Sequence, residues 1–435
     1  MRHNAIQPSH RFRRPAALVL LLALLAVLAF PAAALAFSDV PSDYRYATAI
    51  DELAEIHVIS GYSDGTFRPG ETVTRQQFAK MIVLALDLPV SEGDTCDFWD
   101  VAKSAPGTLF PDHYVAVAAA RSITKGVTAT SFAPLSDVGR AQVITMAVRA
   151  LDKLHDGVLE NPPALYTGCS WKPSFSEAHG ENARRAEFNG LLARLPLPGL
   201  DPWGAMTRGE AAQVMWNMTR LIAAPHAAKI VVIDPGHQAR GDNDQEPIGP
   251  GSSITKPKVT SGTEGVVTGI LESELNLAVG LMVRDELEAR GIRVIMTRTR
   301  QDVNISNIER TKLANQVGAD LYLRVHADGI DSGSVSGIHT LYPVSIKGWT
   351  DDVAAASKRA AQLTQSALVA ATGAKDRGLD ARDDMTGFNW SDVPVIIPEI
   401  GFMTNAAEDR LLAQDSYRHK IALALTQAAA QFVGD

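Results

Sequence analysis

The chain has 435 residues, of which 46% are hydrophobic and 21% are charged. This length allows two or three domains, and the composition is that of a globular rather than a disordered protein. The net charge of −8 argues against a nucleic-acid partner, because phosphate backbones recruit basic surfaces.

Residues 1–36 have the pattern of a secretory signal peptide. A basic stretch up to Arg14 precedes an apolar run over 16–30, and Ala34-Leu35-Ala36 has the small residues of a cleavage site. The apolar run is shorter than the roughly 20 residues that span a bilayer. We therefore predict an exported protein with no membrane association after cleavage; an uncleaved signal anchor is the alternative.

The two cysteines, Cys96 and Cys169, both lie in the exported part. An oxidising compartment permits a disulfide between them, and two buried thiols are the alternative. The sequence alone does not supply the separation of their Cα atoms, on which a disulfide depends.

The region 37–222 repeats itself. The stretch ISGYSDGTFRPGETVTRQQFAKM, Ile59 to Met81, has a weaker echo at 123–146, and a degraded third copy ends at 206–218. Each copy predicts a helix, a glycine turn and a second helix with an apolar face. Because one such unit cannot bury its apolar face alone, the copies are expected to pack on one another as an all-α bundle.

This repeat resembles S-layer homology modules, whose usual form is Phe-x-Asp, then Gly-x-x-Asp-Gly-x-Phe-x-Pro, then Thr-Arg. The first copy matches closely, while the second lacks the Asp-Gly pair. The resemblance implies a three-module bundle that binds a secondary cell-wall polymer, with modules at 37–90, 91–152 and, in degenerate form, 153–222. A guanidinium group suits carboxylate or phosphate. The polymer-binding candidates are therefore Arg75, Arg140 and Arg208.

After a linker at 223–228, the pattern changes to alternating strands and helices. Strands are expected at 229–233, 292–297, 320–325, 338–342 and 393–398. Helices are expected at 274–290, 305–317, 351–372 and 406–433. This alternation predicts an α/β domain over 229–435, an open mixed sheet flanked by helices on both faces.

Three of the expected strands lead into a residue that can bind a metal or act as a base. His237 follows the first strand after Asp-Pro-Gly, His326 ends the third, and Glu399 lies just beyond Pro398 at the end of the last. Open α/β sheets bind their ligands outside the carboxyl ends of the strands. These three side chains are therefore expected to converge.

A carboxylate near the start of the helix 274–290 is expected to complete the group. On chemistry alone Glu272, Glu274 and Glu264 are all candidates, and Glu274 could merely complement the helix dipole. Two imidazoles and one carboxylate leave zinc a fourth position for water, whereas calcium and magnesium prefer all-oxygen shells. Zinc would lower the pKa of that water, and Glu399 would transfer its proton to a leaving nitrogen. The predicted reaction class is metal-assisted hydrolysis of an amide.

The segments IDPGHQ, ESELNL, VHADG and PEIGFMTN resemble the zinc-dependent N-acetylmuramoyl-L-alanine amidases of the two-His, two-Glu type. The resemblance covers essentially all of 229–433. It implies one Zn²⁺ bound by His237, Glu272 and His326, with Glu399 as the catalytic residue. It also implies a secreted, cell-wall-associated enzyme that cuts peptidoglycan between N-acetylmuramic acid and L-alanine.

Two other functions are left open by the sequence. One is a non-catalytic wall protein with a decayed catalytic domain, and the other is a zinc peptidase that cuts within the stem peptide. Analysis of the released products separates these alternatives from the amidase.

Several further residues of the last domain have expected roles. The segment 241–269 is too long for an ordinary connection, and we expect it to form one wall of the substrate groove. Arg310 and Asn405 are interpreted as structural supports. His339 is expected to be a sheet residue whose polar atoms are satisfied.

Overall fold

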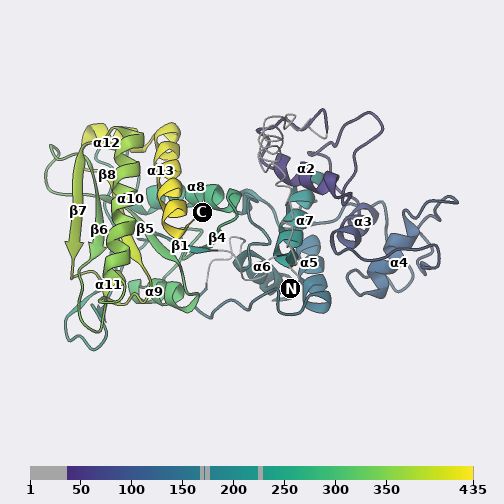
Figure 1. Ribbon diagram of the computed structural model, residues 1–435, viewed down its shortest axis with the longest axis horizontal. Helices are drawn as coiled ribbons and strands as arrows, with labels where there is room; N and C mark the ends of the chain where they lie inside the picture. Colours follow the sequence, from purple (N-terminus) through teal and green to yellow (C-terminus); the bar gives the residue numbers. More distant parts are fainter. Residues whose placement is uncertain (1–36, 167–170, 172–176, 224–228, 435) are drawn as a thin grey trace, which may run out of the picture.

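The computed structural model describes residues 37–166, 171, 177–223 and 229–434. The predicted signal peptide, Cys169 and most of the predicted linker lie outside the described residues. The described chain forms two lobes, a helical bundle and an α/β lobe, which follow each other along the long axis of the molecule (Figure 1). Among the described helices, none is both long and apolar enough to cross a membrane.

The helices of the described bundle come in three successive pairs. They are α2 (Ala47–Glu55) with α3 (Arg75–Ala85), α4 (Asp112–Ala120) with α5 (Arg140–Leu154), and α6 (Glu177–Phe188) with α7 (Arg208–Ala223). Single β-bridges join the pairs in a ring: Thr74 to Asp137, Gly139 to Ala205, and Thr72 to Thr207. Phe78, Ile144 and Met215, one from each pair, lie in a single hydrophobic cluster. The predicted all-α bundle is confirmed.

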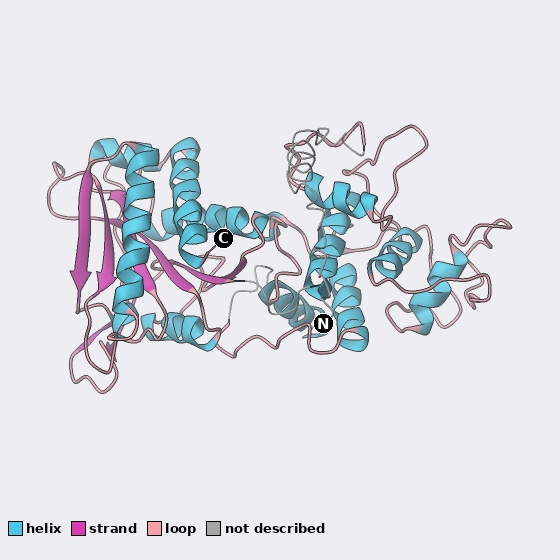
Figure 2. Ribbon diagram, in the orientation of Figure 1, coloured by secondary structure: helices cyan, strands magenta, loops and turns pink. Residues whose placement is uncertain are grey.

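The α/β lobe is built on a six-stranded mixed sheet in the order β4-β1-β5-β8-β6-β7. Figure 2 draws the strands of this lobe as magenta arrows. Its strands are β1 (Ile230–Pro235), β4 (Arg293–Met296), β5 (Leu321–Asp328), β6 (Ile338–Pro343), β7 (Asp376–Arg382) and β8 (Val395–Phe402). β4, β1, β5 and β8 run parallel, whereas β6 is antiparallel to β8 and parallel to β7. The near-continuous apolar runs of β1 and β8 are typical of strands covered on both faces.

Helices cover both faces of this sheet, as predicted. On one face, α8 (Glu272–Ala289), α10 (Ala354–Thr372) and α13 (Asp415–Val433) share a hydrophobic cluster with sheet residues such as Leu323 and Ile400. On the other face, α9 (Asn307–Gln316) and α11 (Thr386–Asn389) pack on Tyr322 and Val395. The short helix α12 (Ala406–Leu412) follows β8, so the expected helix 406–433 is two helices.

Two predicted strand ends are wrong. His326 and Glu399 lie inside β5 and β8 rather than at their ends, because both strands continue pairing beyond them. His326 is the register partner of Glu399, and the pairing resumes after an irregularity at Asp328 and Phe402. Pro398, which was expected to end its strand, pairs with β6 instead.

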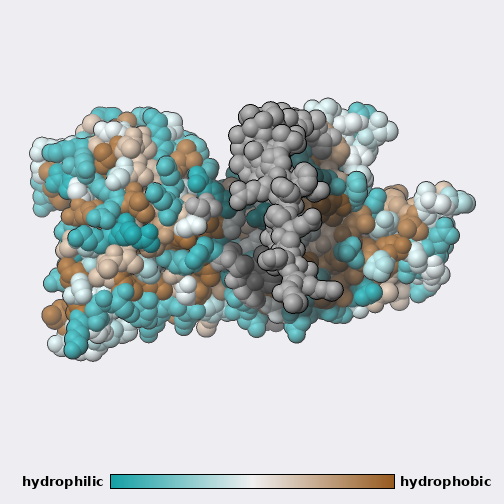
Figure 3. All heavy atoms as spheres, in the orientation of Figure 1, coloured by the Kyte–Doolittle hydropathy of each residue, from teal (hydrophilic) through white to brown (hydrophobic). Residues whose placement is uncertain are grey.

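The helical bundle packs directly against the α/β lobe. Tyr166 and Phe188 of the bundle belong to the same hydrophobic cluster as Val232 and Ile295 of the sheet. Arg293 at the start of the edge strand β4 donates hydrogen bonds to the Phe188 carbonyl and lies 3.0 Å from a Glu160 carboxylate oxygen. The bundle thereby covers the edge strand β4 of the sheet. On the face shown in Figure 3, the surfaces of both lobes mix hydrophilic and hydrophobic residues.

Candidate metal centre and catalytic residue

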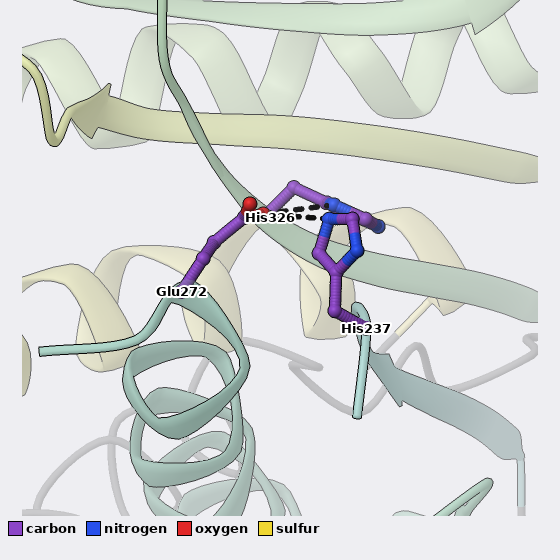
Figure 4. A group of neighbouring side chains, drawn as sticks. All are labelled: His237, Glu272 and His326. Atoms are coloured by element: carbon purple, nitrogen blue, oxygen red, sulfur yellow. Dashed lines mark hydrogen bonds and ion pairs between the residues drawn. The ribbon is translucent and has the colours of Figure 1, made fainter. Parts of the chain in front are cut away.

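Three side chains from separate elements meet beyond the end of β1 (Figure 4). His237 follows β1, Glu272 is the first residue of α8, and His326 lies in β5. Their possible ligand atoms all lie within 4.8 Å of one another. The Oε1 atom of Glu272 is 3.1 Å from both His237 Nε2 and His326 Nδ1. The competing carboxylates Glu264 and Glu274 are exposed to solvent.

The Glu272 carboxylate is buried and held by donors. Its Oε2 accepts a hydrogen bond from the Thr263 amide at 3.0 Å, and its Oε1 accepts from the Asn276 side chain and the Ala327 amide. Burial by itself raises the pKa of Glu272, but the hydrogen bonds and charges of the two histidines lower that pKa below its usual range overall. Glu272 is therefore an ionised carboxylate aimed between two imidazoles.

The sequence Asp-Pro-Gly-His accounts for how His237 is presented. The His237 backbone is left-handed, with φ of 61°, and its Nδ1 lies 2.8 Å from the Thr260 carbonyl. A carbonyl partner requires the Nδ1–H tautomer, which leaves the lone pair of Nε2 free for a metal. Gly236 is needed for close approach, because a Cβ atom there would lie 2.2 Å from the His326 ring.

This donor set fits zinc. Two imidazoles and one ionised carboxylate are the ligands of catalytic zinc sites that keep a position open for water. Histidines that bind a metal through one ring nitrogen commonly donate a hydrogen bond from the other, as His237 Nδ1 does to a backbone carbonyl. Neither cysteine of the sequence lies in this lobe, so thiolate ligation of zinc is excluded here.

Glu399 lies beside this group. It is the register partner of His326, and residues paired in this way on adjacent strands project from the same face of the sheet. Burial raises the pKa of Glu399 well above its ordinary value, and the nearby carboxylates Glu272 and Asp328 raise it further. Its Oε2 atom is buried and has no hydrogen-bond partner in the described part of the chain. A glutamate with a high proton affinity is suited to general acid–base catalysis near neutral pH.

Comparison with known proteins identifies the family. The sequence matches the N-acetylmuramoyl-L-alanine amidase family over residues 231–431 and the S-layer homology domain over residues 36–79. It is 31% identical to the N-acetylmuramoyl-L-alanine amidase Rv3717 of Mycobacterium tuberculosis over 214 residues, which are 48% of this chain and 87% of that protein. The chain belongs to the N-acetylmuramoyl-L-alanine amidase family. The predicted family, and its combination with an S-layer homology domain, are confirmed.

Two further similar proteins match about half of this chain. The amidase LytC of Bacillus subtilis is 31% identical over 220 residues, which are 51% of this chain but 38% of LytC. The crystal structure of the amidase Ami1 from Mycobacterium smegmatis is 29% identical and covers 48% of this chain and 98% of its own, with a TM-score of 0.44.

Buried arginines hold the turn that carries His237. Arg310 pairs with Asp234 at 2.7 Å and donates to the His237 carbonyl at 3.0 Å, which confirms Arg310 as a structural support. Arg298 donates to the carbonyls of Pro235 and Gly236. Sequence reasoning missed Arg298, because an arginine after an apolar strand gives no sign that it turns inward.

Two other expectations for this lobe have clear outcomes. Asn405 caps α12 by accepting hydrogen bonds from the amides of Ala407 and Glu408, as expected of a support. His339 lies in β6, as expected, but the expectation that its polar atoms are satisfied is wrong, because its buried Nδ1 atom has no hydrogen-bond partner among the described residues.

The segment 241–269 is folded against the α/β lobe. It contains an antiparallel pair that was not predicted, β2 (Asp242–Pro247) and β3 (Thr255–Val259). Trp390 donates to the Pro247 carbonyl, and the Lys256 amine binds Asp384 at 3.0 Å. Farther along, Thr260 and Thr263 contact the metal-site residues, so this segment borders the centre.

Proposed function

We propose that this amidase cleaves the amide bond between N-acetylmuramic acid and L-alanine in peptidoglycan. His237, Glu272 and His326 would hold one Zn²⁺, and Glu399 would be the catalytic acid and base. The observation that carries this proposal is the meeting of two imidazoles and an ionised carboxylate beside a buried glutamate. When bound, zinc acidifies water and polarises a carbonyl oxygen.

Glu399 carries the proton through the reaction. It accepts a proton from water as the water oxygen bonds to the carbonyl carbon, and it gives that proton to the nitrogen as the C–N bond breaks. The buried position of Glu399 supports both steps, because the acid form of the carboxyl is stabilised between them.

Product analysis of digested peptidoglycan tests this function. We expect the zinc-loaded enzyme to release stem peptides that begin with a free L-alanine amine, detected by mass spectrometry. Products cut within the stem peptide would instead identify a zinc peptidase. Absence of any released peptide would favour the non-catalytic wall protein.

We also propose that the helical bundle attaches the enzyme to the cell surface by binding a secondary cell-wall polymer. The three modules would be 37–90, 91–152 and 153–222. The match to an S-layer homology domain supports this location. Such attachment would raise the effective concentration of the enzyme near its substrate.

The three candidate arginines differ in their partners. Arg75 and Arg208 each donate two hydrogen bonds to backbone carbonyls of another helix pair, and neither forms a salt bridge with a carboxylate among the described residues. Arg140 instead forms two 2.9 Å hydrogen bonds with the Glu210 carboxylate. The ion pair with Glu210 neutralises the Arg140 guanidinium. We therefore propose Arg75 and Arg208, rather than Arg140, as anion-binding residues.

A groove of about 260 Å³ adjoins Arg208. Lys80 lines the same groove, together with the aromatic rings of Tyr62 and Phe110. Two cations beside aromatic rings suit an anionic saccharide, since the rings offer apolar surface and the cations bind charge. We propose this groove as the principal polymer site.

Replacing Lys80 tests the groove. We expect Lys80→Met to weaken binding to purified cell walls about tenfold, because one charge-assisted hydrogen bond is lost while the apolar stem is kept. Cosedimentation with intact walls, and with walls stripped of their secondary polymer, measures the effect. Lys153→Met is the matched control, since Lys153 is exposed on α5 and is not among the residues that line the groove. Equal losses in both variants would contradict the site.

A further inference from the structure

His339 lies directly across the sheet from the proposed catalytic residue. The antiparallel pairing of β6 with β8 places His339 opposite Glu399, and the parallel pairing of β5 with β8 places His326 on the other side. Paired residues on neighbouring strands project from the same face, with Cβ atoms about 5 Å apart. His326, Glu399 and His339 therefore form one row across three strands, with Glu399 in the middle.

Each residue of this row has a buried polar atom without a hydrogen-bond partner among the described residues. These atoms are His326 Nε2, which the proposed metal could use, and Glu399 Oε2 and His339 Nδ1, which belong to no proposed ligand. Buried polar atoms in folded proteins are nearly always hydrogen-bonded, because an unmet partner costs free energy. Two unpaired polar atoms on neighbouring side chains of the same sheet face indicate that these side chains interact with each other in the active enzyme.

The remaining contacts of His339 fix its ring without using Nδ1. The ring stacks on Phe402 with centroids 5.8 Å apart, and its Nε2 faces Asp328 at 3.6 Å. The His339 side chain is 16% exposed, the same fraction as His326. His339 is thus held opposite Glu399 on the neighbouring strand and belongs to no other hydrogen-bond pair among the described residues.

We propose that His339 is a positioning residue for Glu399, donating a hydrogen bond from Nδ1–H to Glu399 Oε2. An ionised carboxylate can only accept, so its buried oxygen requires a donor. Nδ1 is a donor in the imidazolium and, when the ring is neutral, in the Nδ1–H tautomer, so the proposed bond requires one of these two forms of His339.

This bond gives the two oxygens of Glu399 separate tasks. With Oε2 bound to His339, Oε1 is the oxygen that takes the proton from water and returns it to the leaving nitrogen. His339 transfers no proton during the catalytic cycle, so its protonation state is the same before and after the reaction. The inference rests on the proposed role of Glu399, because His339 acts only through that carboxyl.

Steady-state kinetics of the full, zinc-loaded chain on a soluble muropeptide test this role. We expect His339→Leu to lower kcat about ten- to a hundredfold, the effect of one hydrogen bond to a charged group, with KM unchanged. His339→Asn should recover much of kcat, because the asparagine amide supplies a donor near the position of Nδ1. His419→Leu, at an exposed histidine, is the matched control and should keep wild-type kinetics.

Two outcomes would overturn the inference: an unchanged kcat in His339→Leu, or an equal loss of kcat in the Leu and Asn variants. A raised KM with normal kcat would overturn it as well, because that indicates substrate binding. The residual rate of Glu399→Gln should not fall further when His339→Leu is added. If Glu399→Gln itself kept the wild-type rate, the proposed function would fail rather than this inference alone.

Discussion

Glu399→Gln is expected to reduce peptidoglycan hydrolysis by about 10²- to 10⁴-fold while the protein still binds one zinc ion. The amide has the shape of the carboxyl group but cannot take up the proton of the attacking water. Glu399 stands beside the three clustered ligands rather than among them, so metal binding should survive. Release of stem peptides and the zinc content of the purified protein are the two measurements.

Glu274→Gln is the matched control for this experiment. Glu274 is the exposed carboxylate two residues beyond Glu272 on α8, and it competed with Glu272 as a ligand on chemistry alone. Its variant should keep both activity and zinc. Loss of zinc from Glu399→Gln would make Glu399 a ligand, and a wild-type rate in that variant would require another base.

The sequence predicted the site best where a polar residue directly follows an apolar strand. The apolar run before Asp-Pro-Gly-His predicted both β1 and the position of His237 just beyond it, and the similar positions of His326 and Glu399 made a shared site the favoured interpretation. The convergence of His326 and Glu399 followed from the parallel arrangement of their strands. The sequence did not predict that both residues lie inside their strands rather than at the ends. A proline usually ends a strand, and only the pairing of Pro398 with β6 shows that β8 continues.

Elements formed by polar residues escaped prediction. The edge strand β7 reads DRGLDAR, and β2 reads DNDQEP. Neither has the apolar alternation that marks a strand, because each is largely exposed and is held by pairing with a neighbour. The same limit applies to His339, whose position opposite Glu399 depends on strand order rather than on any local pattern.

Asp234→Asn is expected to lower the free energy of unfolding by about 3–5 kcal/mol, the usual cost of breaking a buried ion pair. The Asp234 side chain is fully buried and lies 2.7 Å from Arg310 and 2.8 Å from Arg324. Burial by itself raises the pKa of Asp234, but these two arginines lower it overall, so the group is ionised. Removing its charge leaves two buried guanidinium groups uncompensated.

Asp234→Asn should also weaken zinc binding, because Arg310 bonds both to Asp234 and to the backbone carbonyl of the proposed ligand His237. Urea denaturation followed by tryptophan fluorescence measures the stability, and zinc titration of the folded variant measures the site. Asp302→Asn is the control: Asp302 is 88% exposed and pairs only at the surface with Arg300, so its loss should cost at most about 1 kcal/mol. If the two variants unfolded at the same urea concentration, Asp234 would not be the charge that holds the turn before His237.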